Sequence, residues 1–149
     1  MVMSTDDDLI KYQIDILTYG IDEFKAEHEL AREDILRKLR LEWWGRAKSY
    51  NAFEGNSTTA QMDPLKLNEA QFLRCAVFRV LAEYALPQLT KWNADGEEDK
   101  FQVMMKHYHT RYLQEFEAIL LDGIEYDFDS DGVVQDDERV SVNTLRLIH

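Results

Sequence analysis

Residues 69–86 read EAQFLRCAVFRVLAEYAL, and on a helix this stretch is apolar almost all the way round. A helix without a continuous polar face is one that other elements surround. Asn68, with Gln71 three residues later, resembles a capping box at its start, and Pro87 predicts its end. The stretch therefore predicts a central, buried helix.

A last helix is predicted from about Glu97 to Asp122, after the turn pair Asp95-Gly96. Its apolar residues recur at helical spacing. One face carries Phe101, Met104, Tyr108, Tyr112, Glu115 and Ile119, with Met105 and Phe116 beside it. Gly123 suits the position just beyond the end of a helix, where a left-handed residue is common.

Two helices are predicted before the central one. Residues 6–18, DDDLIKYQIDILT, begin with three aspartates, which favour a helix N-terminus, and Gly20 ends this segment. A long amphipathic helix then begins at Ile21 or Asp22 and stops near Gly45. Its apolar positions are Ile21, Phe24, Ala31, Ile35 and Leu39, as far as Trp43-Trp44.

These patterns predict a mainly α fold, a four-helix bundle-like domain over residues 1–122. Within it, residues 46–66 show no sustained periodicity and are expected to form an extended loop or contact arm. Residues 123–149 are expected to hold an acidic loop and a C-terminal strand. Because Val140, Val142 and Thr144 are β-branched, a small β-hairpin or an extended strand is expected there.

The acidic loop, Asp127–Glu138, reads DFDSDGVVQDDE and meets every fixed position of the EF-hand template. Hard oxygen ligands at these positions suit Ca²⁺, with a backbone carbonyl at the seventh position and a bidentate glutamate at the twelfth. Gly132 supplies the sharp turn. The candidate metal ligands are Asp127, Asp129, Asp131, Val133, Gln135 and Glu138.

The flanks of this loop do not fit an EF-hand. Gly123 lies four residues before Asp127, and the residues after Glu138 are β-branched, so the two flanking helices are expected to be absent. Three interpretations stay open at this point: a Ca²⁺ site, a metal-free acidic turn between the strands IEY and RVSV, and a site for another cation.

Charge and cysteine content narrow the classes of function. With 29 acidic against 17 basic residues, the formal charge is −12, which argues against gripping nucleic acid. Eight of the acids lie between Asp122 and Glu138, with no Lys or Arg among them. A lone cysteine, Cys75, fits a reducing compartment, and no apolar run or secretory leader is found. A protein made in the cytosol, with no membrane span, is expected.

No catalytic constellation is found, so an enzyme is not expected. His107 and His109 are two residues apart on a helix and face different directions, unlike a helical metal pair. His28 lies near an apolar stripe and is interpreted as a packed or boundary histidine. Cys75 sits in the most apolar helix, where an inert thiol is expected.

Trp43 and Trp44 are adjacent, so on a helix their rings diverge by about 100° and should not both enter one core. A boundary tryptophan at a helix end is one interpretation, and a subunit contact is the other. Basic residues gather in the same region and invite an acidic neighbour. They are Arg32, Arg37, Lys38, Arg40, Arg46 and Lys48.

The opening DDDLIKYQIDILTYGIDEFKAEHELAREDILRKLRLEWW resembles the start of head-tail connector (adaptor) proteins of tailed bacteriophages. The D-x-D-x-D-G loop followed by a short strand ending RLIH is similar to the C-terminal part of some members. The resemblance implies a structural virion protein, made in the host cytoplasm, that forms a ring at the neck between portal and tail.

Such rings are typically dodecameric, so the implied partners are further copies of the chain, the portal protein and tail or neck proteins. DNA would pass through the lumen without specific binding, and no membrane is involved. The alternative is a small calcium-binding regulatory or interaction module with a single EF-hand-like loop.

Overall fold

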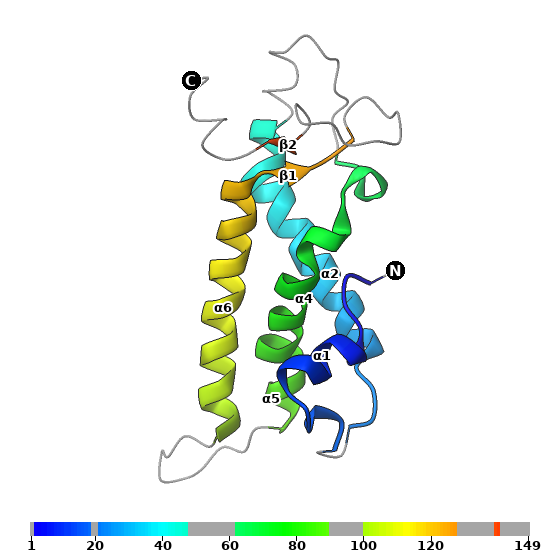
Figure 1. Cartoon of the computed structure of the whole chain (residues 1–149), viewed down its shortest axis with the longest axis vertical. Coiled ribbons are helices and arrows are strands. Elements are labelled where there is room, and N and C mark those ends of the chain that lie inside the picture. The colour runs from blue at the N-terminus through cyan, green and yellow to red at the C-terminus, as the bar shows by residue number, and fades with distance from the viewer. Residues whose placement is uncertain (1, 19–20, 48–61, 90–99, 128–138, 141–149) are drawn as a thin grey trace. The chain divides into compact units, whose positions relative to one another are not determined.

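The computed structural model describes residues 2–18, 21–47, 62–89, 100–127 and 139–140, and its fold is mainly α, as predicted. The helices are α1 (Asp6–Tyr12), α2 (Lys25–Leu39), α4 (Leu73–Arg79), α5 (Leu86–Leu89) and α6 (Lys100–Asp122), followed by strands β1 (Ile124–Glu125) and β2 (Arg139–Val140) (Figure 1). Short 3-10 turns cover Ile16–Thr18, Pro64–Lys66 and Glu69–Phe72, and π-helical turns cover Arg40–Trp44 and Val80–Ala85.

The chain forms two compact units, which are described separately. The first unit comprises residues 1–33 and 72–116, and the second comprises residues 34–71 and 117–149. The long helices α2 and α6 each contribute residues to both units. The predicted division into residues 1–122 and 123–149 stays a prediction.

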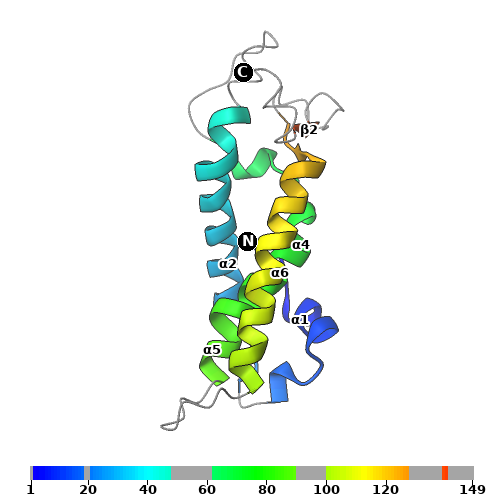
Figure 2. The ribbon, with the colours of Figure 1, turned by 90° about the vertical axis from the view of Figure 1, so that its left-hand side faces the viewer.

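In the first unit, α1 and α6 both contact Phe78, which is buried in α4. The ring of Tyr12 from α1 meets Phe78 edge-on at 5.2 Å, and the ring of Tyr108 from α6 stacks on it at 5.9 Å. Helices α4 and α5 follow one another along a single helical path, and the first part of α6 lies beside it (Figures 1 and 2). The prediction of a central buried helix is confirmed. Its buried residues are Phe72, Cys75, Ala76, Val77, Phe78, Val80, Leu81, Ala82, Ala85 and Leu86.

Helix ends in the first unit differ from the predictions. Helix α1 ends at Tyr12 because Gln13 is extended, and the Gln13 side chain donates to the Tyr108 hydroxyl at 2.7 Å. Helix α2 begins at Lys25, later than Ile21 or Asp22, and the N–H of Phe24 donates to the carboxylate of Asp6.

The central helix also continues past its predicted stop at Pro87, to Leu89. Proline inside a helix removes one hydrogen bond and clashes with the carbonyl four residues earlier. Here the π-helical turn Val80–Ala85 comes directly before Pro87, and the N–H of Leu86 bonds to Leu81 O, five residues back. The wider turn changes the register of the carbonyls ahead of the proline.

In the second unit, the helical path of α2 continues through the π-helical turn Arg40–Trp44 to Ala47. Gly45 itself does not end the helix, since it has helical φ and ψ of −57° and −42°, and the described helix reaches two residues beyond this predicted stop. Of the predicted arm at 46–66, Ala47 is helical and Pro64–Lys66 forms a 3-10 turn, whereas residues 48–61 lie outside the described residues.

The end of α6 is as predicted. Gly123 has φ of 102°, in the region that favours glycine, and its N–H donates to Ile119 O at 3.1 Å. Strand β1 then pairs antiparallel with β2, with Ile124 opposite Val140 and Glu125 opposite Arg139. Residues 141–149, the rest of the predicted strand, lie outside the described residues.

Candidate functional site

The predicted metal loop begins at Asp127, which is the one candidate ligand that the structure describes. Its side chain is half-buried, and its N–H donates to Lys66 O at 3.0 Å. The other candidate ligands, Asp129, Asp131, Val133, Gln135 and Glu138, lie outside the described residues. The Ca²⁺ site therefore stays a prediction, with the metal-free turn as its alternative.

The two ends of this loop are strands. Strand β1 precedes residues 128–138 and strand β2 follows them, and the two strands pair with each other. The described residues next to each end of the loop are therefore not helical. The expected absence of a helix-loop-helix is confirmed for these flanks. Among the described residues, no three His, Cys, Asp or Glu side chains gather as a metal site.

Side chains from Asn68 and Gln71 hold the base of the loop. Asn68 Nδ2 donates to Glu125 Oε2 at 2.5 Å, and the Asn68 N–H donates to Glu125 O at 3.1 Å. Gln71 Nε2 donates to Gly123 O at 3.2 Å, while Gln71 Oε1 accepts from the Glu125 N–H at 2.9 Å. The predicted capping box is thus wrong, because both side chains bind the strand region more than fifty residues away instead of each other's backbone N–H.

Tyr126, the residue directly before Asp127, belongs to an aromatic cluster with Trp43 and Trp44. The ring of Tyr126 is 6.0 Å from Trp43 and 5.2 Å from Trp44, and the two tryptophan rings are 5.9 Å apart. All three side chains are buried. Such tilted and edge-on ring pairs add about 0.5–1.5 kcal/mol each beyond the area they bury.

The prediction that the two tryptophans could not share a core is wrong. Both belong to the π-helical turn Arg40–Trp44, which has more residues per turn than an α-helix and so a smaller angle between neighbours. Tyr126 then packs against both rings. The sequence carries no signal for a π turn, and none that pairs Tyr126 with residues about eighty positions earlier.

The Tyr126 hydroxyl accepts a hydrogen bond from the Asp63 N–H at 2.9 Å. Burial raises the pKa of this phenol above its ordinary value of about 10. The Asp63 N–H bond lowers the pKa, whereas the carboxylates of Asp63 and Asp127 raise it further. The phenol is therefore neutral at physiological pH, beside the first carboxylate of the acidic loop.

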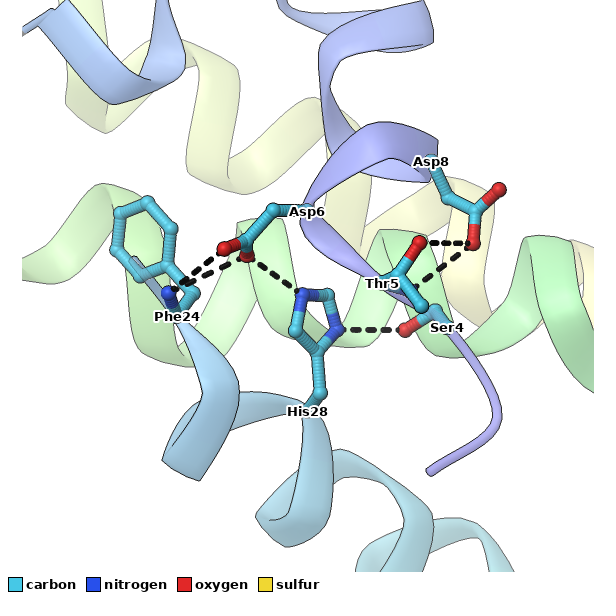
Figure 3. A network of polar contacts seen from close by, with 6 residues as sticks. All are labelled: Ser4, Thr5, Asp6, Asp8, Phe24 and His28. Carbon is cyan, nitrogen blue, oxygen red and sulfur yellow. Dashed lines mark hydrogen bonds and ion pairs between the residues drawn. The ribbon is translucent and has the colours of Figure 1, made fainter. Parts of the chain in front are cut away.

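A second polar cluster lies in the first unit and centres on His28. Nδ1 of His28 is 2.7 Å from Ser4 Oγ, and Nε2 is 3.0 Å from Asp6 Oδ1 (Figure 3). Ser4 and His28 are each 2% exposed. Asp6 also accepts from the Phe24 N–H, and the N–H and hydroxyl of Thr5 both donate to Asp8 Oδ2 (Figure 3).

This Ser4–His28–Asp6 cluster holds the N-terminal segment against the start of α2. Its order of Ser, His and Asp resembles a nucleophile, base and orienting acid. However, Ser4 Oγ is buried, and Asp6 is shared with a backbone N–H that begins a helix. An open hollow of about 240 Å³ adjoins the cluster and is lined by Val2, Ser4, Thr5, Asp6, Glu23, Lys25 and His28. The interpretation of His28 as packed is confirmed, although its two partners were missed.

The remaining candidates lie where the sequence predicted. His107 and His109 are exposed on α6, and His109 Nδ1 is 3.2 Å from Glu83 Oε1. Cys75 is fully buried in α4. In the part of the chain that the structure describes, no helix is both long and apolar enough to cross a membrane.

Comparison with known proteins gives no relative. No family model, no curated protein and no solved structure matches the chain.

Proposed function

We propose that this chain is a structural virion protein that forms a ring, a dodecamer, between the portal and the tail of a tailed phage, as a head–tail adaptor. The support begins with the resemblance of residues 6–44 and of the acidic C-terminal segment to that family. The partners would be neighbouring copies, the portal protein and tail or neck proteins, and no chemistry is assigned to the chain.

One structural observation favours this proposal, namely the outer face of the continuous helix from Lys25 to Ala47. In a chain of net charge −12, this helix exposes Arg37, Arg40 and Arg46 together with Leu41, which is 75% exposed. Interfaces are enriched in arginine, and an exposed leucine among arginines gives a neighbour an apolar contact with a charged rim.

Assembly is the direct test. The purified chain would be studied by native mass spectrometry and negative-stain electron microscopy, alone and mixed with a portal ring. We expect closed rings of about twelve copies that stack on the portal. A chain that stays monomeric with the portal present would overturn the proposal.

The alternative, a small calcium-binding module, is favoured by a separate observation. The first candidate ligand, Asp127, is held by its backbone bond to Lys66, and β1 and β2 bring the two ends of the loop together. A loop whose ends are already closed loses less conformational entropy when it orders around an ion.

Calcium binding would be measured by isothermal titration calorimetry, with tryptophan emission as a second readout because Trp43 and Trp44 pack on Tyr126. We expect saturable binding that Asp129→Ala abolishes. Asp122→Ala is the matched control, since Asp122 is an exposed carboxylate at the end of α6, outside the loop. No heat at millimolar Ca²⁺ would exclude the site in the isolated chain.

A further inference from the structure

The exposed side of the C-terminal half of the long helix has an unusual make-up. Arg37, Leu41 and Gly45 recur every four residues along one line, and Arg40 and Arg46 flank that line. All five are exposed, and we call them the basic face. The segment from Arg37 to Arg46 contains four basic residues and one acidic residue, against −12 for the whole chain.

The arginines of the basic face make no ion pair in the described part of the chain. Among the described residues, Arg37, Arg40 and Arg46 have no ion-pair partner, whereas their neighbour Lys38 pairs with Glu42 at 3.0 Å. Three unpaired guanidinium groups on one helix face form a surface that favours carboxylates, because arginine binds them in a bidentate way.

Gly45 adds a second observation. It lies in a helical conformation, where glycine is a poor residue, and a Cβ added there would meet nothing within 4 Å. The described residues therefore give no steric reason for glycine at this position. A residue without a side chain between Leu41 and Arg46 lets another backbone approach the helix closely.

We propose that the basic face docks the acidic segment Asp122–Glu138 of a second copy of this chain. The charges are complementary, since that segment carries eight acidic residues and no Lys or Arg. The two surfaces are different, so the contact is head-to-tail and repeats from copy to copy until a ring closes. The inference rests on the proposed ring and names the surfaces that would join its neighbours.

The test uses two variants with complementary defects. The face variant, Arg37→Glu with Leu41→Ser, removes the basic face and keeps the acidic segment. The loop variant, Asp136→Lys with Asp137→Lys, changes two acids that are not candidate metal ligands and keeps the face. A matched control, Lys25→Glu with Leu30→Ser, makes the same changes in charge and polarity at two exposed residues near the start of the same helix.

Self-association would be measured by analytical ultracentrifugation over a range of concentrations at low salt. We expect the wild type and the control to assemble and each variant to need at least about tenfold higher concentration. An equimolar mixture of the two variants should form a one-to-one dimer and nothing larger, because one intact face meets one intact acidic segment.

The outcomes separate this inference from the proposed function. Rings that persist in both variants would overturn the inference and leave the adaptor proposal standing. Assembly through the face without portal binding would support the inference and overturn the adaptor role. A wild type that stays monomeric at every concentration would overturn the inference; this is the result expected if the acidic segment covers the basic face of its own chain. An equal loss of self-association in the control would overturn it as well.

Discussion

The two units of the chain hold their parts together by different means. In the first unit, the N-terminal segment is joined to α2 by hydrogen bonds among Ser4, His28 and Asp6. In the second, Tyr126, directly after β1, is buried against the rings of Trp43 and Trp44, and hydrogen bonds from Asn68 and Gln71 to the β1 region add to this apolar contact. A polar cluster fixes geometry but gains little net free energy, whereas buried rings contribute most of theirs by leaving water. The two regions should therefore respond differently to substitution.

The largest effect is expected from Trp43→Ala, because Trp43 is fully buried and contacts Trp44 and Tyr126. Removing a buried tryptophan side chain costs about 3–5 kcal/mol through lost transfer free energy and the cavity left behind. Urea unfolding would measure this loss. Leu41→Ala, on the exposed side of the same helix, should stay within about 0.5 kcal/mol of the wild type. Equal losses for both would show that the aromatic cluster does not hold the second unit.

A smaller loss is expected from Asp6→Ala in the first unit. It removes the acceptor for His28 and for the Phe24 N–H, and it should cost about 1–3 kcal/mol. Asp7→Ala is the control, since Asp7 lies in the same turn of α1 and is exposed. Hydrogen exchange at the first turn of α2 should speed up for Asp6→Ala alone. If hydrogen exchange at the first turn of α2 is as slow in Asp6→Ala as in the wild type, Asp6 does not cap this helix.

The aromatic cluster should also show an alkaline pH dependence. Since the folded-state pKa of Tyr126 is raised, its contribution is complete below the unfolded-state pKa of about 10 and is lost as pH rises above it, because the unfolded chain ionises first. Tyr126→Phe should be less stable at neutral pH by about 1 kcal/mol, because the Asp63 N–H loses its acceptor. The gap between the two proteins should narrow from about pH 9 to pH 11. A gap that widens would reverse the sign of the assigned shift.

The same contrast explains what the sequence could predict. Helices α2, α4 and α6 and the stop at Gly123 follow from local periodicity and from glycine, which act within a few residues. The partners of His28 lie twenty-two and twenty-four residues earlier, in a segment that the sequence marks only as a helix start. The capping pattern of Asn68 and Gln71 is local, whereas their bonds to Glu125 and Gly123 depend on the tertiary fold. Polar partners that are distant in sequence leave no periodic signal.

The smallest effect, and the only gain, is expected from Gly45→Ala. In a helical position with open space around the added Cβ, alanine should stabilise the second unit by about 0.5–1 kcal/mol. Thermal unfolding at a concentration where the chain is monomeric would measure the gain. If Gly45 is there to admit a neighbouring chain, the same substitution should weaken assembly while it strengthens the monomer. A gain in stability with unchanged assembly would place the close approach elsewhere on the helix, whereas opposite shifts would tie this glycine to the interface.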